Sequence, residues 1–159
     1  MTAAVLVTGG TAVAQAAEVG TCGSADLDIA FGRVEGAAGT VYREVVLTNR
    51  GPGACVLRGF PGVSYVDYQG RRVGAAAERV GARGPLLTLA PGGRAVSDVG
   101  FARVDNFDPD ACRKTAVRGI RVYPPDATVP LHLPMTDQHG CAGDVSPFGH
   151  QLTVASVRS

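Results

Sequence analysis

Hydrophobic and polar residues alternate along most of the 159-residue chain, as they do in β-strands with one buried face. In residues 26–31, for example, Leu27, Ile29 and Phe31 fall on the same side. Groups of Gly, Pro, Asn and Asp separate the alternating runs at spacings of about ten residues. The pattern predicts strands at residues 26–31, 40–48, 55–57, 63–68, 71–75, 86–89, 94–104, 117–123, 129–133 and 151–157.

Short strands at this spacing, with no long amphipathic helix between them, predict an all-β fold. The expected architecture is a β-sandwich, in which two antiparallel sheets pack face to face. Two segments lack the alternation. Residues 74–85 are rich in Gly and Ala and are predicted to form a mobile loop, and residues 105–110, DNFDPD, are predicted to form an acidic loop.

Composition supports a single folded domain over residues 17–159. Hydrophobic residues make up 45% of the chain and charged residues 18%, which is enough apolar material for a core. The 22 Gly and 10 Pro residues suit a protein of many turns. A net charge of +1 supplies no long-range field that would attract nucleic acid. We therefore expect no nucleic-acid partner, and we expect a monomer.

The N-terminal stretch at residues 3–17 is small and apolar, and the first 32 residues contain no Lys or Arg. Ala14-Gln15-Ala16 matches the A-x-A pattern of a signal-peptidase site, although the basic start of a signal peptide is missing. We interpret residues 1–16 as a truncated signal peptide, and the alternative is a flexible apolar arm. No stretch approaches the ~20 apolar residues of a membrane-spanning helix, so no transmembrane segment is expected.

The four cysteines, Cys22, Cys55, Cys112 and Cys141, are widely spaced and form no C-x-x-C motif. An even number of cysteines in an exported chain indicates disulfides rather than a zinc or redox motif. Of the three possible pairings we favour Cys22–Cys55 and Cys112–Cys141, because each closes a local loop of about thirty residues. In the chain-entropy model, closing such a loop stabilises a fold by roughly 3.5 to 4 kcal/mol.

Several of the turns and strand ends, taken together, resemble a known family. The segments that carry the resemblance are residues 47–51, 55–63, 67–70, 87–95 and 121–125, with Cys112 and Cys141. They resemble exported actinobacterial domains known as domain of unknown function 4232. The resemblance implies an immunoglobulin-like sandwich outside the cytoplasmic membrane and no established activity. Lipoprotein members carry a small residue before a lipidated cysteine, and Thr21 before Cys22 does not fit, so we expect free secretion.

Three residues near the C-terminus, His132, Met135 and His139, are the candidate metal ligands. Imidazole and thioether groups suit copper, so an exported copper-handling protein is one alternative function. Against it, His132 is opposite in phase to Leu131 and Leu133 and is predicted to face solvent. The three residues also lack a strict ligand spacing. We therefore expect no bound metal and no cofactor.

Signals for catalysis are weak. The chain has no G-x-S-x-G and no H-E-x-x-H motif. Cysteines held in disulfides supply no thiolate nucleophile. We therefore expect a protein that is not an enzyme.

Two arginines in the predicted loop, Arg79 and Arg83, are candidate contacts for an acidic partner. A sandwich cross-linked by disulfides holds its loops firmly at their bases, as antibody-like domains do. We therefore predict a non-catalytic module of the cell envelope, secreted or envelope-associated, that binds an envelope protein or glycan or has a structural role there. A stiff exposed loop also suits a secreted protease inhibitor, which is the second alternative.

Overall fold

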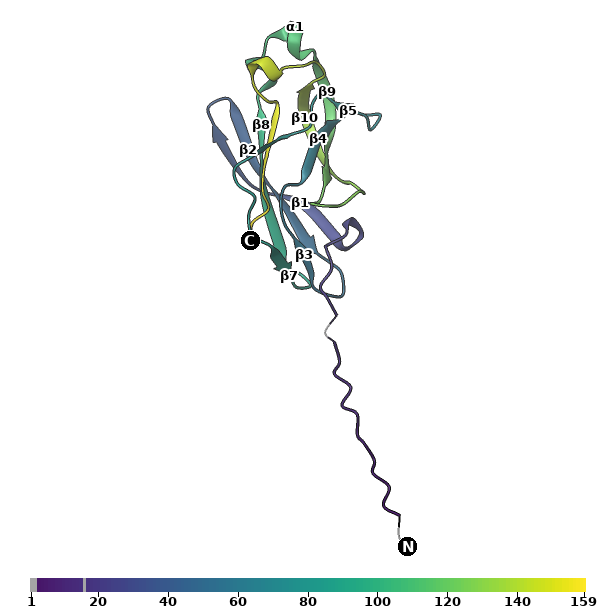
Figure 1. Cartoon of the computed structure of the whole chain (residues 1–159). Helices are drawn as coiled ribbons and strands as arrows, with labels where there is room; N and C mark the ends of the chain where they lie inside the picture. Colours follow the sequence, from purple (N-terminus) through teal and green to yellow (C-terminus); the bar gives the residue numbers. More distant parts are fainter. Residues whose placement is uncertain (1–2, 16) are drawn as a thin grey trace.

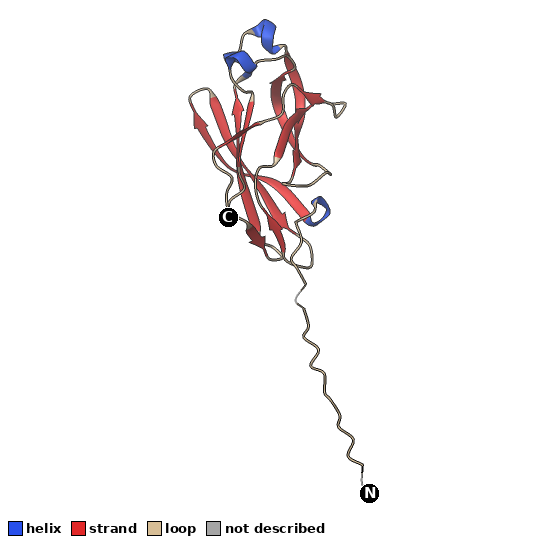
Figure 2. Cartoon of the chain, viewed as in Figure 1, coloured by secondary structure: helices blue, strands red, loops and turns tan. Residues whose placement is uncertain are grey.

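The computed structural model describes residues 3–15 and 17–159, which are nearly all strand, turn and loop (Figure 1, Figure 2). One sheet has five strands, in the order β1 (Leu27–Ala37), β2 (Thr40–Asn49), β8 (Arg94–Ala102), β11 (Leu152–Ala155) and β6 (Glu78–Val80). The other has four, in the order β10 (Leu131–Cys141), β9 (Lys114–Tyr123), β4 (Gly62–Val66) and β5 (Arg72–Val73). A small separate pair consists of β3 (Cys55–Leu57) and β7 (Leu87–Leu89).

These layers confirm the predicted all-β, immunoglobulin-like sandwich. Neighbouring strands are antiparallel with one exception among the described residues, the parallel pair of β6 and β11. β6 lies inside residues 74–85, so this segment contains a strand where a loop was predicted. Its residues are all exposed, and a three-residue strand with no buried face has no alternation to detect.

Two strands are longer than predicted because each contains a β-bulge. The pairing of β1 with β2 shifts between Phe31 and Val34 and then continues to Ala37. The pairing of β10 with β9 shifts between Pro134 and Gln138. In β1 one extra residue reverses the inward and outward phase, and in β10 two extra residues interrupt the pairing, so a prediction based on alternation ends at each point. The start predicted for β10 at Val129 is wrong, since β10 begins at Leu131.

The predicted acidic loop folds into two short helical turns, η2 (Val104–Asn106) and α1 (Pro109–Cys112). Asp108 caps α1, because its Oδ1 accepts hydrogen bonds of 3.0 Å from the backbone N–H groups of Asp110 and Ala111. Pro109 occupies the first helical turn, where its missing N–H costs nothing. Further short turns are η1 (Ser24–Asp26) and η3 (Ser146–Phe148).

The main core lies between the two large sheets. It combines fully buried side chains from both layers, among them Val45 and Val99 from one sheet and Tyr65, Ile120 and Val122 from the other. Strands that are distant in sequence therefore contribute buried apolar side chains to the same core, and this burial drives the packing of the two sheets.

Both predicted disulfides are present, Cys22–Cys55 and Cys112–Cys141. They lie at opposite ends of the sandwich, because Cys55 begins β3 and Cys112 ends α1 (Figure 1). The first one joins the N-terminal segment to β3, where the Cys22 N–H also donates to Val56 O at 3.0 Å. Each end of the core is thus closed by a covalent cross-link.

The N-terminal residues 3–15 form no helix or strand and are exposed, and they extend away from the sandwich (Figure 1). Ala16, after which the signal-peptidase cut is predicted, lies outside the described residues. Across residues 3–15 and 17–159, no helix has the length and apolar character needed to cross a membrane.

Candidate anion-binding corner

The edge strand β6 carries Arg79, one of the two predicted binding residues. β6 pairs with β11, and Arg79 lies opposite Val154 in the register. The Arg79 side chain is exposed and extends over the ring of Phe60, with its Cζ atom 5.7 Å from the ring centroid. A guanidinium over an aromatic face is attracted by the ring quadrupole, which orients Arg79 without neutralising its charge.

Phe60 belongs to the turn that leaves β3. Gly59 has φ of +102°, a value in the region that glycine adopts most readily. Its carbonyl oxygen accepts hydrogen bonds from the Val157 N–H at 2.8 Å and from Ser156 Oγ at 3.1 Å. The turn is therefore fixed to the C-terminal segment, and Phe60 is held half-buried beneath Arg79.

Arg83, the second predicted residue, reaches the same turn from the loop after β6. Its Nε lies 3.3 Å from the position that a Cβ on Gly59 would occupy. The loop is anchored at Gly84, whose N–H donates to Ser156 Oγ at 3.0 Å and whose carbonyl accepts from Arg58 Nε at 3.0 Å. These contacts bring Arg58, Arg79 and Arg83 together around the Gly59–Phe60 turn, and we call this group with Phe60 the arginine corner.

None of the three arginines of the arginine corner forms an ion pair with another described residue. All three are exposed. A guanidinium presents several N–H donors in a planar fork that matches carboxylate, sulfate and phosphate groups. Three such groups on a fixed turn can hold an anionic surface, and they offer no nucleophile or general base.

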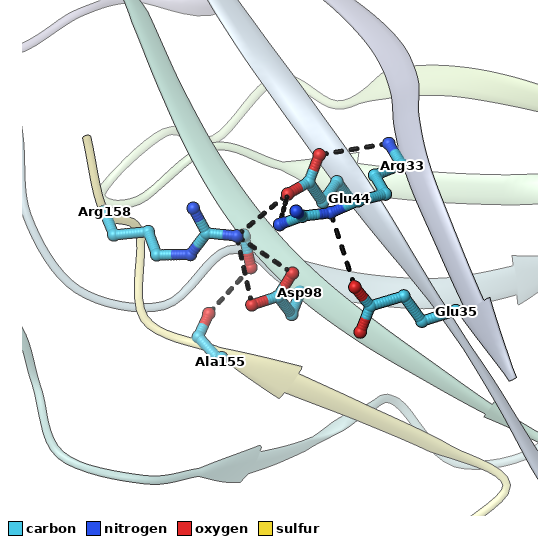
Figure 3. Close-up of polar contacts among 7 residues, drawn as sticks. Arg33, Glu35, Glu44, Asp98, Ala155 and Arg158 are labelled. Carbon is cyan, nitrogen blue, oxygen red and sulfur yellow. Dashed lines mark hydrogen bonds and ion pairs between the residues drawn. The ribbon is translucent and has the colours of Figure 1, made fainter. Parts of the chain in front are cut away.

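A second cluster of charged residues, on the outer face of the five-stranded sheet, is different because its charges are paired internally. Glu44 lies between two arginines, 2.9 Å from Arg33 Nη2 and 3.0 Å from Arg158 Nη2 (Figure 3). Arg158 also contacts Asp98 at 3.2 Å, and Arg33 contacts Glu35 at 3.5 Å. This ion-pair network ties β1, β2 and β8 to the C-terminal segment, so its role is structural.

The ion-pair network also shifts the ionisation of its members. A hydrogen bond from the Arg33 backbone N–H, followed by one from Arg158, lowers the pKa of Glu44 below its usual 4.5. The hydrogen bond to Asp98, and then the one to Glu44, raises the pKa of Arg158. Both groups therefore stay charged over the whole neutral range.

Sequence analysis identified Arg79 and Arg83 but missed Arg58 and Phe60. Arg58 and Phe60 stand on either side of Gly59 in a run that reads as an ordinary turn. They approach Arg79 and Arg83 only because the turn after β3 and the loop after β6 both bond to Ser156. No local signal in the sequence indicates that contact.

The structure does not gather the three candidate metal ligands around one point. His132 is exposed, as predicted from its phase, whereas Met135 is buried in the main core. His139 is half-buried and lines a different hollow from His132. No group of three or more His, Cys, Asp or Glu side chains suited to a metal ion occurs among the described residues. The copper hypothesis therefore gains no geometric support.

Comparison with family models places most of the chain in one family. The model described as "Domain of unknown function (DUF4232)" matches residues 22–158, which is most of the chain and all of the sandwich. Comparison with curated proteins and with solved structures gives no match.

Proposed function

Since the chain belongs to the DUF4232 family, whose description names no activity, we propose a function from the surface itself. The protein is a non-catalytic, exported module that binds an anionic envelope partner through the arginine corner. The observation that carries this proposal is the set of three exposed arginines without ion-pair partners around Phe60.

Export is supported by the two disulfides. Disulfides form and persist in oxidising compartments and are rare in the reducing cytosol. With both pairs formed, the described chain has no free cysteine. A secreted or envelope-associated location gives this cross-linked sandwich the conditions it needs.

A binding role is supported by how the arginine corner is held. Ser156 Oγ bonds both to Gly59 O and to Gly84 N, so the turn and the loop keep a fixed spacing. A surface that is ordered before binding loses little entropy when a partner docks. An acidic protein segment or an acidic glycan presents the complementary charge.

The binding experiment compares one charge-reducing variant with a matched control. Arg79→Gln with Arg83→Gln removes two charges from the arginine corner. Arg72→Gln with Arg118→Gln removes from the four-stranded sheet two exposed arginines that form no ion pair with another described residue. The probes are a short polyglutamate peptide, an oligogalacturonate and a neutral dextran oligosaccharide, with binding followed by calorimetry at physiological salt.

We expect one or both acidic probes to bind the wild type and the control variant, and dextran to bind neither. Arg79→Gln with Arg83→Gln removes two charge pairs between the protein and the acidic probe, each contributing roughly 0.5 to 1 kcal/mol. We therefore expect this variant to bind the probe about tenfold more weakly than the wild type does. Equal weakening by both variants would show non-specific attraction and would contradict the proposal. No binding by either acidic probe would also contradict it.

The protease-inhibitor alternative stays a prediction. Arg83 lies in an exposed loop, residues 81–86, but its side chain lies against Gly59 rather than extending away from the domain.

A further inference from the structure

A cleft lies between the two sheets at the end of the sandwich that carries α1. Its volume is about 290 Å³. Residues of both layers line it: Arg43 and Phe101 from the five-stranded sheet, Lys114, Gln138 and His139 from β9 and β10, and Asp105 from η2. A polar cleft that opens into a sandwich core is unusual enough to need an explanation, because that space is normally filled with apolar side chains.

Arg43 is the charged residue of this cleft that stands on the inner face of a strand. Side chains two residues apart on a strand share a face, and Val45 is fully buried in the main core. Arg43 therefore stands on the inner face of β2, where an aliphatic residue is expected. Its Cζ atom lies 5.6 Å from the ring centroid of Phe31 and 6.0 Å from that of Phe101, so the guanidinium lies against two neighbouring rings.

Arg43 has no acidic counterpart among the described residues. Its Nε is buried and has no hydrogen-bond acceptor within the protein. Asp105 also lines the cleft, but its carboxylate pairs with Lys114 at 3.0 Å. Asp137 lines the cleft as well, and it forms no ion pair with Arg43.

The Tyr65 hydroxyl, whose ionisation the charge of Arg43 favours, still remains neutral and supplies no counter-ion. Burial raises the pKa of Tyr65 to about 12, although the hydrogen bond from Gln138 and the charge of Arg43 oppose this shift. The Tyr65 hydroxyl oxygen accepts its hydrogen bond from Gln138 Nε2 at 3.1 Å. The guanidinium is thus balanced by aromatic faces alone.

Charge and shape indicate the class of ligand. The ionised side chains of the cleft are Arg43, Arg103, Lys114, Asp105 and Asp137, which leave one positive charge in excess. One excess positive charge, with the planar fork of Arg43 on the inner face of β2, matches a single carboxylate better than a doubly charged phosphate.

Beside the cleft lies a second hollow of about 260 Å³ that shares Arg43. Its other lining residues are Phe31, Pro134, Met135 and Thr136, which are mostly apolar. An apolar group attached to the carboxylate would pack against them.

We propose that the inter-sheet cleft is a second binding site, which takes a carboxylate that carries an apolar group. Arg43 holds the carboxylate in its guanidinium fork, and the adjoining hollow holds the apolar part. The carboxylate belongs either to a small organic acid or to the C-terminal residue of a peptide. This site is independent of the arginine corner, because the two share no residue.

The experiment follows the Arg43 side chain by NMR, through its Nε–Hε signal, while the intact protein is titrated with hexanoate. Hexanamide tests the need for charge, and sodium chloride at equal ionic strength tests for a salt effect. Acetyl-Ala-Leu with a free C-terminus, compared with its C-terminal amide, tests the peptide source. We expect saturable shifts of Arg43 and Gln138 with hexanoate or with the free-acid peptide, and none with the two neutral compounds.

Two variants give a second measurement. Arg43→Met keeps an unbranched apolar stem against the rings and removes the guanidinium fork. Arg121→Met is the matched control, since Arg121 also has a buried Nε without a protein acceptor and its Cζ lies 5.5 Å from the ring centroid of Tyr123. Arg121 does not line the inter-sheet cleft. Binding should weaken by about tenfold or more in Arg43→Met and stay unchanged in Arg121→Met.

The source of the carboxylate follows from which probe binds more tightly. Tighter binding of hexanoate assigns the cleft to a small acid, and tighter binding of the peptide assigns it to a C-terminus. The proposal is overturned if the Arg43 signal responds to neither hexanoate nor the free-acid peptide more than it does to chloride. It is equally overturned if Arg43→Met, shown to be folded by its spectrum, binds as the wild type does.

Discussion

At the scale of single residues, buried amide side chains form hydrogen bonds that link segments distant in the sequence. Gln151 is 3% exposed and joins three segments. Its Oε1 accepts from the Cys141 N–H at 2.7 Å, and its Nε2 donates to Val73 O at 3.0 Å and Ala75 O at 3.2 Å. Asn49, fully buried, does the same for Gly51, Gly53 and Leu89. Each amide satisfies backbone groups that would otherwise be buried without a partner.

We predict that Gln151→Met lowers the free energy of unfolding by about 2 to 4 kcal/mol, because two buried backbone groups and one partly buried group lose their partners. Urea unfolding followed by circular dichroism measures the change. Gln69→Met is the control, since Gln69 is exposed and its side chain makes no hydrogen bond with a described residue. A loss for Gln151→Met no greater than that for the control would contradict the bridging role.

At the scale of elements, short strands and turns are held by contacts from elsewhere in the chain. β6 depends on β11, and the two helical turns in the acidic segment sit beside the Cys112–Cys141 disulfide. The C-terminal segment depends on the ion-pair network, where Arg158 meets Glu44 of β2 and Asp98 of β8 (Figure 3). Networks that link several elements matter more to stability than isolated surface pairs.

The ion-pair network predicts a dependence of stability on pH. Because the pKa of Glu44 is lower in the folded state than its usual 4.5, ionised Glu44 favours folding above that value. The contribution is complete above about pH 4.5 and is lost as the pH falls through the lower folded-state pKa. Glu44→Gln should therefore reduce stability at pH 7, and its difference from the wild type should shrink toward pH 3.

Urea midpoints of both proteins at several pH values check this expectation. Glu78→Gln serves as the control, because Glu78 is exposed and forms no ion pair with a described residue. If the difference in urea midpoint between Glu44→Gln and the wild type stays constant from pH 7 to pH 3, the charge of Glu44 is not the cause of the lost stability.

At the scale of the whole molecule, one disulfide cross-links each end of the sandwich. Cys22–Cys55 lies in the apolar cluster beneath β3 and β7, and Cys112–Cys141 lies in another cluster with Phe107 and Val145. They close loops of similar size, with sequence separations of 33 and 29 residues. Since the two bonds share no neighbours, their contributions should be nearly additive.

We predict that Cys22→Ser with Cys55→Ser and Cys112→Ser with Cys141→Ser each lower the free energy of unfolding by roughly 3 to 4 kcal/mol. The exported wild-type protein should show no free thiol by mass spectrometry with alkylation, and four after reduction. Urea unfolding compares the two double variants. Free thiols before reduction, or one variant as stable as the wild type, would contradict the view that both ends need a cross-link.

Much of this architecture can be predicted from the sequence, because the determining signals are local. Alternation within a strand, turn residues between strands and the spacing of four cysteines predict the sandwich and the pairing of its disulfides. Such signals end where extra residues interrupt the pairing, as after Phe31 and Pro134, and where a strand is too short to alternate, as in β6. His132 was placed correctly on the surface because its phase is set by its immediate neighbours.

The binding surfaces were decided by tertiary structure. The arginine corner forms because Ser156, far along the chain, bonds to both the Gly59 turn and the Gly84 loop. In the inter-sheet cleft, Arg43 of β2 packs against the rings of Phe31 of β1 and Phe101 of β8. A sequence records which residues carry charge, but whether a charge has a partner depends on which distant segments fold against it. The sequence by itself therefore determined the compact frame and its cross-links, and the fold determined which arginines are left for a ligand.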